Sequence, residues 1–316
     1  MAPSLLNRRY EIVRSIGRGA DGLVLLARDR GDGDAPRVIK VVGDVSPEAR
    51  TRLAGEFRRL ARLAHPNLVR VFDLEVASTA IADVPAGALF FTGEHIDGGP
   101  ASDAIAGASA TDRLAMLLAI IGDVASGLAH VHAAGLIHND VKPDNIAVTR
   151  SDGKSRAVLL DFGLAAARGA RGQARGTPRY MAPEALAGAA EARSDLYSLG
   201  ASVYHLAAGE PPFPADEPTA LVRQIVDSEP APLRGRAPWL PAALAELVMR
   251  LLAKDPSARP SSAQVVLAEL ARIGEGLGIA PRRAVTDADQ APLLPPPLIG
   301  RDDAVEALVQ ALGALG

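Results

Sequence analysis

Two short clusters of polar residues indicate the chemistry that this chain of 316 residues could perform. The first is the sequence HNDVKPDN, which contains Asp140, Lys142 and Asn145, and the second is DFG, which begins at Asp161, sixteen residues after Asn145. A carboxylate such as Asp140 can orient an attacking hydroxyl and accept its proton, while Lys142 can steady the transferring phosphate. Asn145 and Asp161 offer oxygen ligands that would hold Mg2+ against a nucleotide. In this order, the two clusters predict a phosphoryl-transfer site.

A glycine-rich turn lies upstream, between two apolar runs. It contains Gly17, Gly19 and Gly22, and the flanking segments 12–16 and 23–27 predict two strands of a hairpin. Glycine lets the backbone approach a phosphate closely. The context of strand, turn and strand favours a lid over phosphates rather than a dinucleotide-binding turn, which needs a strand followed by a helix.

Lys40 is one of only four lysines in the chain, against thirty arginines. It ends the predicted strand 38–40, where its ammonium could contact the α and β phosphates of a nucleotide. Glu56 lies in the next predicted helix, residues 50–63, and is the expected ionic partner of Lys40. An exposed pair would contribute little. However, the HPNLV stretch that follows at residues 65–69 resembles a motif of the protein kinase family, and this resemblance favours the functional interpretation.

Helices must position the first cluster. Residues 112–134 carry apolar side chains at intervals of three and four and predict a long helix with one face in the core, which Gly135 is expected to end. Two residues, Leu136 and Ile137, then lead into His138. A last amphipathic helix is predicted over residues 261–271.

Together, these motifs resemble the protein kinase family, in the eukaryotic-like serine/threonine form found in bacteria. The segment that follows Asp161 is similar to a kinase activation segment, because it closes with GTPRYMAPE. The resemblance implies that Glu184 pairs with Arg259 and that Asp195 holds the backbone of the catalytic loop. Lys142 and Thr177, by the same resemblance, point to serine or threonine rather than tyrosine as the acceptor.

The resemblance also implies the fold, the cofactors and the partner. The expected architecture is α+β and two-lobed, with a small β-rich N-lobe that carries one long helix (about 10–93), a hinge (94–99) and a larger helical C-lobe (100–273). ATP and Mg2+ are the expected cofactors, and a protein with a reactive serine or threonine is the expected partner.

Further residues are implied to line the adenine site. These are Ile16, Val24, Val38, Gly93 at the gatekeeper position, Glu94 and Ile96 with hinge backbone groups, and Ala147 below the base. Val38 stands where the family has alanine and Ala147 where it has a larger aliphatic residue. The summed volume is nearly constant, so we expect a displaced but intact adenine site. Gly93 predicts a cavity behind adenine, with close backbone packing as the alternative explanation.

Asn139 departs from the family pattern, because it replaces the arginine usual between the histidine and the aspartate. Such an arginine binds a phosphate on the activation segment, and its absence removes the main electrostatic reason for phosphorylation to order that segment. Residues 164–175 contain no serine, threonine or tyrosine, which leaves Thr177 and Tyr180 as the hydroxyls of the segment. We therefore predict a non-RD kinase that is not switched on by activation-loop phosphorylation and is controlled by flanking sequence or an associated domain.

Composition excludes several other classes of protein. The net charge of −3 and the pI near 6.1 give no reason to expect nucleic-acid binding. The chain has no cysteine, so it has no disulfides and no thiol chemistry. The first nine residues do not resemble a secretory signal, and apolar runs such as 114–121 are too short to span a membrane. We expect a cytoplasmic protein.

The composition changes after residue 273. Residues 274–297 are rich in glycine and proline and predict a linker. Residues 298–316 resemble the opening segment of AAA or STAND-type ATPase modules, which would make a regulatory module a further partner, and an ordinary C-terminal amphipathic helix is the alternative.

Two other functions compete with an active serine/threonine kinase. A pseudokinase scaffold is suggested by Asn139, Val38 and Gly93, but every charged catalytic position is filled. A small-molecule phosphotransferase would share the catalytic-loop chemistry, but the GTP to APE stretch and the expected pair of Glu184 and Arg259 disfavour it.

Overall fold

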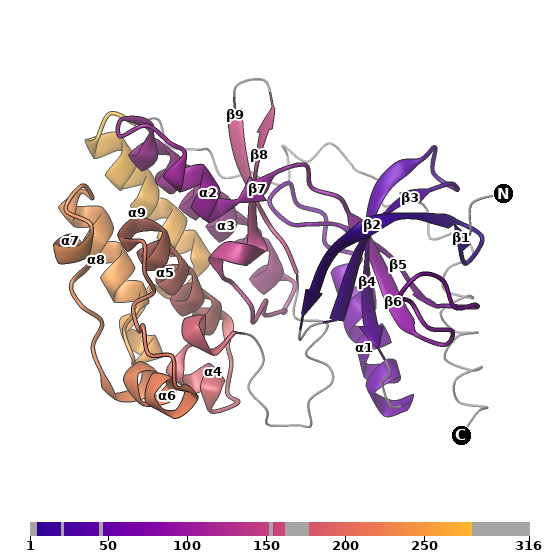
Figure 1. Cartoon of the computed structure of the whole chain (residues 1–316). Coiled ribbons are helices and arrows are strands. Elements are labelled where there is room, and N and C mark those ends of the chain that lie inside the picture. The colour runs from indigo at the N-terminus through magenta and orange to yellow at the C-terminus, as the bar shows by residue number, and fades with distance from the viewer. Residues whose placement is uncertain (1–4, 20–21, 44–46, 152–153, 162–176, 280–316) are drawn as a thin grey trace.

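The chain folds into two lobes that a short segment joins (Figure 1). This computed structural model describes residues 5–19, 22–43, 47–151, 154–161 and 177–279. The N-terminal lobe consists mainly of strands and the C-terminal lobe mainly of helices, which confirms the predicted α+β, two-lobed fold.

Three sequence predictions lie outside the described residues. They concern Phe162 and Gly163 with the rest of the activation segment up to residue 176, the linker from residue 280 and the tail 298–316.

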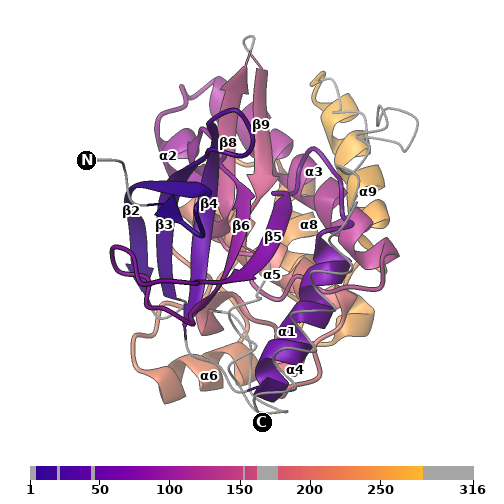
Figure 2. The ribbon, with the colours of Figure 1, turned by 90° about the vertical axis from the view of Figure 1, so that its right-hand side faces the viewer.

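A six-stranded antiparallel sheet forms the N-terminal lobe, in the order β1-β2-β3-β4-β6-β5. One long helix, α1 (Pro47–Leu60), lies against the sheet (Figure 2). The strands are β1 (Leu5–Leu6), β2 (Tyr10–Gly19), β3 (Gly22–Asp29), β4 (Ala35–Gly43), β5 (Val71–Val76) and β6 (Leu89–Glu94). The helix begins and ends three residues before the predicted range 50–63, because Pro47 suits the first helical turn.

The two faces of this sheet have different roles, as the period of two residues along a strand requires. Leu23, Leu25 and Ala27 of β3 point into an apolar core that Ile39 and Phe90 share. The alternate residues of β3 and β4, such as Val24 and its cross-strand partner Lys40, face the other side. That side contains the candidate site.

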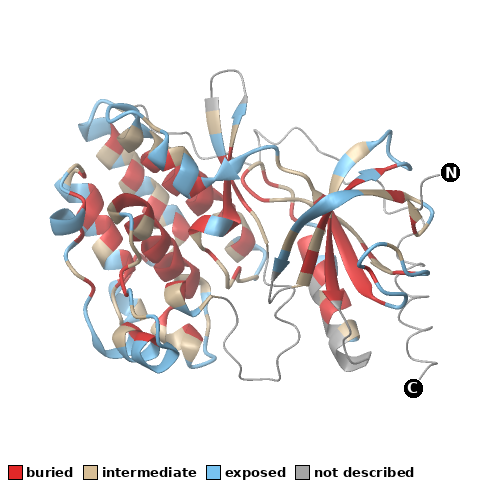
Figure 3. Cartoon of the chain, viewed as in Figure 1, coloured by how far each residue is buried: buried red, intermediate tan, exposed pale blue. Residues whose placement is uncertain are grey.

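The C-terminal lobe packs around α3 (Asp112–Ala133) and α5 (Ala192–Ala208), whose residues are largely buried (Figure 3). Helix α5 can approach the end of α8 (Ala242–Leu251) closely because Gly200 of α5 has no side chain. A Cβ at Gly200 would lie 2.7 Å from the Cβ of Leu251. The other helices are α2 (Ala101–Ala106), α4 (Pro183–Leu186), α6 (Pro218–Asp227), α7 (Leu233–Arg236), α8 (Ala242–Leu251) and α9 (Ala263–Gly276).

Among the described residues, α3 is the one helix whose length and composition would also suit a membrane span. However, 72% of its most apolar window is buried inside the protein, as in the core helix of a globular domain. The uninterrupted apolar runs of this region are too short to indicate a span, and only the whole helix has the required length and composition.

A small sheet and a helical turn belong to the C-terminal lobe and lie on its side nearest the N-terminal lobe. The sheet contains β7 (Gly99–Pro100), β8 (Ile146–Ser151) and β9 (Lys154–Leu159), and the turn η1 (Pro143–Asn145) precedes β8. The HPN stretch of the N-terminal half is bonded to β9: Asn67 donates its side-chain amide to Ala157 O at 2.8 Å. Leu159 N–H donates to Asn67 O at 2.8 Å, and Val69 N–H donates to Leu159 O at 3.0 Å.

The last helix, α9, continues through Gly276, beyond the predicted range 261–271. Ile273 and Ile279 pack against the core, and Ile279 N–H donates to Gly274 O at 2.9 Å. Residues 274–276, predicted as the start of the linker, are therefore helical, because partial burial of these two side chains offsets the helix-weakening glycines of this stretch.

Candidate active site

Asp195 of α5 binds the backbone of the predicted catalytic loop. The Asp195 residue is 1% exposed. Its carboxylate accepts hydrogen bonds from the backbone N–H groups of His138 and Asn139, at 2.8 and 2.9 Å. It also lies 2.8 Å from His132 Nε2. The predicted role of Asp195 is confirmed.

The backbone of Asn139 is in the left-handed region, with φ of 65°. Asparagine tolerates this region better than most residues with a side chain. The neighbouring His138 ring is buried and bonds to Leu160 O at 3.0 Å. Burial lowers the pKa of His138, so this ring is a structural support rather than a charged group.

Asp140 lies at the centre of a dense network. Asn145 donates to its Oδ2 at 2.7 Å, and Lys142 Nζ lies 3.0 Å from the same oxygen. Thr177 donates to the other oxygen, Oδ1, from its backbone N–H at 3.0 Å and from its hydroxyl at 3.2 Å. Lys142 in turn donates to Thr177 Oγ1 at 2.7 Å. The structure therefore brings together four residues that the sequence motifs separate by up to 37 positions.

These contacts keep Asp140 ionised. Burial by itself would raise the pKa of this carboxyl, but the Lys142 ammonium and the hydrogen bonds from Asn145 and Thr177 outweigh burial, and the pKa lies below its ordinary value. A fixed carboxylate of this kind can orient a hydroxyl group and accept its hydrogen bond.

A second contact joins the two lobes. Lys40 of β4 is 5% exposed, and its Nζ lies 3.2 Å from Asp161 Oδ2. Asp161 has a φ of 45°, and the preceding residue donates from Leu160 N–H to Asn145 O at 2.7 Å. This backbone bond ties the stretch that carries Asp161 to Asn145, so that both predicted metal ligands lie on adjoining segments. Glu56 is part of α1, but its side chain lies outside the described part of the structure.

The residues present fit a hard divalent cation. Asn145 uses its amide nitrogen for Asp140, which leaves its amide oxygen available, and Asp161 has one carboxylate oxygen that is not used for Lys40. Within the described residues, no group of three or more His, Cys, Asp or Glu side chains could hold a metal alone. Mg2+ is commonly held by one or two carboxylates plus phosphate oxygens and water, so this sparse ligand set suits a metal that arrives with a nucleotide.

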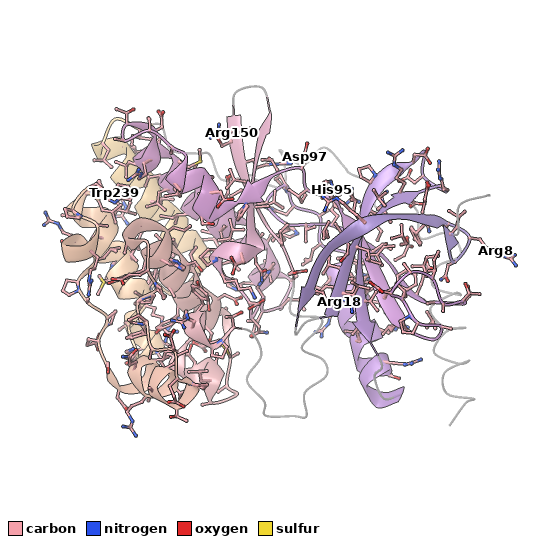
Figure 4. The ribbon with its side chains drawn as sticks, in the orientation of Figure 1. Arg8, Arg18, His95, Asp97, Arg150 and Trp239 are labelled. Carbon is pink, nitrogen blue, oxygen red and sulfur yellow. The ribbon has the colours of Figure 1, made fainter. Side chains whose placement is uncertain are left out.

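A cavity of about 420 Å³ opens beside Lys40 and Asp161, between the sheet and the C-terminal lobe. Seven residues predicted for the nucleotide site lie on its wall: Ile16, Val24, Val38, Lys40, Gly93, Glu94 and Ile96. The chain passes between the lobes here, and Figure 4 shows His95 and Asp97 on that connection. Two larger hollows, one on the C-terminal lobe and one beside β2, contain none of the predicted site residues.

The apolar residues that complete the wall were not predicted from the sequence. Val69, Val71, Phe91 and Leu160 line the cavity, whereas the predicted Ala147 is buried in β8 and is not on the wall. Leu160 is the aliphatic residue that lies on the wall next to Asp161. A single aliphatic residue beside a motif has no distinctive sequence signal, although its position directly before DFG could have suggested it.

Gly93 has both of the properties that the sequence left open. A Cβ at Gly93 would lie 3.3 Å from Arg70 O, so backbone packing is close. At the same time, Val69 and Val71 line the cavity together with Gly93, so the open space reaches β5 behind the hinge strand.

The glycine-rich turn is described at Gly17, Gly19 and Gly22, and residues 20–21 are outside the described part. Gly22 has a φ of 114°, and a Cβ there would lie 2.3 Å from Val41 O. Glycine is therefore required at this position by the packing of β3 against β4, whether or not a phosphate is bound.

The predicted pair of Glu184 and Arg259 is confirmed. Arg259 donates to both carboxylate oxygens of Glu184, at 2.7 and 2.9 Å, and Ser194 adds a bond of 2.6 Å. Burial would raise the pKa of Glu184, but the Arg259 and Ser194 hydrogen bonds outweigh it and lower the pKa.

Comparisons with known proteins agree with this geometry. Residues 10–270 match the family described as protein kinase domain. Serine/threonine-protein kinase PknB of Mycobacterium tuberculosis is 34% identical over 304 residues, which cover 92% of this chain and 47% of PknB. The DNA damage-responsive serine/threonine-protein kinase RqkA of Deinococcus radiodurans is 37% identical over 268 residues, 82% of this chain and 38% of RqkA. The chain thus spans about half or less of the length of these relatives.

A solved structure is also similar. The crystal structure of a double mutant of the Mycobacterium tuberculosis PknI kinase domain has a TM-score of 0.64 and 30% sequence identity. It covers 88% of this chain and 99% of the PknI chain. The similarity therefore extends over almost the whole of that domain.

Proposed function

Because the chain belongs to the protein kinase family, in its bacterial serine/threonine branch, we propose that it transfers the γ-phosphate of ATP to serine or threonine hydroxyls of proteins. The observation that carries the proposal is the Asp140 network. Lys142, Asn145 and Thr177, from two distant segments, each have a polar atom within 3.2 Å of Asp140, beside a cavity that Lys40 and Asp161 line.

Each residue then has a chemical task. Asp140 orients the acceptor hydroxyl and takes its proton, and Lys142 places a positive charge beside the transferring group. Lys40 binds the α and β phosphates, which requires it to exchange its contact with Asp161 for the nucleotide. Asn145 and Asp161 would hold Mg2+, which when bound neutralises negative charge on the phosphates.

We also propose that activation-loop phosphorylation does not switch the enzyme on. Asn139 offers no guanidinium for a phosphate, and the two hydroxyls at the end of the activation segment are already in use. Thr177 is bonded to Asp140 and Lys142, and a phosphate on Thr177 would place negative charge against the Asp140 carboxylate. Tyr180 is 7% exposed and bonded to His205. If phosphate at either position proves necessary for activity on a separate substrate, this part of the proposal is wrong.

The test of the main proposal compares wild type with Asp140→Ala. Purified protein is incubated with Mg-ATP and a generic protein substrate such as casein, and phosphate is located by mass spectrometry. We expect phosphoserine or phosphothreonine with wild type and at least about a hundredfold less with Asp140→Ala. Asp103→Ala, which removes an exposed carboxylate on α2, is the matched control.

The competing functions give different results. A nucleotide-binding scaffold would transfer no phosphate in either form. A small-molecule phosphotransferase would consume ATP only with a small acceptor and leave the protein substrate unlabelled.

A further inference from the structure

Two titratable rings face each other beside the catalytic loop, outside the network described above. Tyr180 lies in the turn η3 (Pro178–Tyr180), and His205 lies in the last turn of α5. Tyr180 Oη and His205 Nδ1 are 2.7 Å apart, and the rings are stacked with an interplanar angle of 8° and centroids 6.0 Å apart. The tyrosine is buried, and the histidine is half-buried.

The chemistry of the pair defines which atom carries each proton. Burial raises the pKa of Tyr180 to about 12, so the phenol keeps its proton at neutral pH. Burial also lowers the pKa of His205, so the imidazole is neutral. The phenol is then the donor and Nδ1 the acceptor, which places the imidazole proton on Nε2.

Two charged groups act on this pair within the described part of the chain. Asp144 of η1 favours a charge on His205, and Arg179 of η3 opposes it. Arg179 itself is fixed by bonds to Phe213 O at 3.3 Å and to Asp216 at 3.4 Å. A positive charge on His205 would therefore lie half-buried near a guanidinium, and among the described residues the exposed Asp144 carboxylate is the group that compensates it.

A continuous path of hydrogen bonds connects His205 to the catalytic carboxylate. His205 binds the Tyr180 hydroxyl, and Tyr180 N–H donates to Thr177 O at 3.0 Å. Thr177 then donates to Asp140 from its N–H and its hydroxyl. Each residue of the path is joined to the next by hydrogen bonds, and the turn from Thr177 to Tyr180, closed by its own backbone bond, lies in the middle.

We propose that His205 is a positioning residue for phosphotransfer, which holds the turn from Thr177 to Tyr180 over Asp140 while its Nδ1 is unprotonated. The inference rests on the proposed kinase function. When the His205 ring is packed against Tyr180, the protonated imidazole is disfavoured. Because protonation is easier when the two rings separate and His205 is solvated, low pH shifts the equilibrium toward that separated state. Separation releases Tyr180 and weakens the hold of Thr177 on Asp140, and activity falls.

The test measures kcat and KM for a protein substrate between about pH 5.5 and pH 8, the range in which histidine titrates. Wild type is expected to lose kcat/KM below about pH 6.5. His205→Leu removes the acceptor and should lower kcat/KM at pH 7.5 by about fivefold to tenfold, the effect of one buried hydrogen bond, and abolish the acid limb. His205→Asn keeps an acceptor near the Nδ1 position without a titrating group, so it should recover part of the loss and also lack the acid limb.

Two further variants define what the result means. Tyr180→Phe removes the donor and should behave like His205→Leu. Tyr204→Phe is the matched control, because Tyr204 precedes His205 on α5 but donates to Ala231 O, away from the Thr177 turn. Its pH profile should match wild type.

A separate measurement, which does not depend on enzyme activity, tests the inference even if a variant folds poorly. The His205 ring is titrated by NMR in wild type and in Tyr180→Phe, and we expect a higher pKa in the variant because the closed packing is lost. The inference is overturned if wild type and His205→Leu have the same pH profile of kcat/KM. It is also overturned if His205 has the same pKa by NMR in wild type and in Tyr180→Phe. If wild type transfers no phosphate at any pH, the proposed function itself has failed, which is a different outcome.

Discussion

Replacement of Arg259 by methionine should lower the free energy of unfolding strongly, although Arg259 is not part of the catalytic loop. Arg259 makes five hydrogen bonds: two to the Glu184 carboxylate and one each to the carbonyl groups of Arg193, Ala253 and Lys254. Its side chain is 0% exposed, and that of Glu184 is 17% exposed. Methionine fills a similar volume but donates no hydrogen bond, so a largely buried carboxylate loses its counter-ion.

Breaking a buried ion pair by removing one partner costs about 3–5 kcal/mol. We expect a value near the lower limit, about 3 kcal/mol, because Ser194 still donates to Glu184 and part of the carboxylate reaches water. For a domain of this size that corresponds to a fall in Tm of roughly 6–12 °C. Urea unfolding at pH 7, monitored by circular dichroism, measures the free energy of unfolding directly.

The matched control is Arg250→Met. Arg250 pairs with Glu269 at the surface and its side chain is 52% exposed, so its loss should cost less than about 1 kcal/mol. A difference below about 1 kcal/mol between Arg259→Met and Arg250→Met would refute the reasoning, since the buried pair would then contribute no more than an exposed one.

The pH dependence gives a second check on the same pair. Because the pKa of Glu184 is lowered in the folded protein, its contribution to stability is present above the ordinary glutamate pKa and is lost as the pH falls through the folded-state pKa. The stability gap between wild type and Arg259→Met should therefore narrow below about pH 4.5. A gap that stays constant down to acid pH would contradict the electrostatic explanation.

Three other changes have defined outcomes. Thr177→Ala should lower kcat by about tenfold or more while Thr177→Ser retains most of it, because serine keeps the hydroxyl between Lys142 and Asp140; equal losses in steady-state assays would contradict this. Gly98→Ala should weaken nucleotide binding in calorimetry, because its Cβ would lie 2.6 Å from Val148 O and displace the hinge, and unchanged affinity would show that the strand yields. Wild type should bind ATP analogues with a bulky adenine substituent, and Gly93→Met should not, because the cavity extends past Gly93 to β5; analogue binding that is equal in both proteins would count against an open cavity.

The charged and polar residues of the site were predictable from sequence, because their type and spacing are themselves the signal. Asp140, Lys142 and Asn145 lie within six positions, and their neighbours on the chain remain neighbours in the site. The pair of Glu184 and Arg259 was predictable only through the family resemblance, since 75 residues separate them.

The apolar wall was not predictable in the same way. Val71 fits any strand, and only the pairing of β5 with β6 places it opposite Gly93. Val69 precedes β5 and is placed by its backbone bond to Leu159 O of β9. The prediction that Ala147 lines the cavity was wrong for a related reason. A position on a strand specifies the face of the sheet, but not whether a short side chain extends as far as the cavity wall. The contact of Tyr180 with His205 joins residues 25 positions apart and has no local pattern at all.

The bonds of Asn67 and Val69 to β9 have a mechanical consequence. Residues 65–69 precede two strands of the N-terminal sheet in sequence, yet their hydrogen bonds fasten them to the opposite half of the molecule. When the two halves rotate to admit or release a nucleotide, this stretch should travel with the helical half, and the bending must be absorbed on either side of it and at the strand exit near Glu94. A fluorophore on residue 66, which is less buried than Asn67, would therefore report no distance change to one on α5, whereas a fluorophore on α1 would.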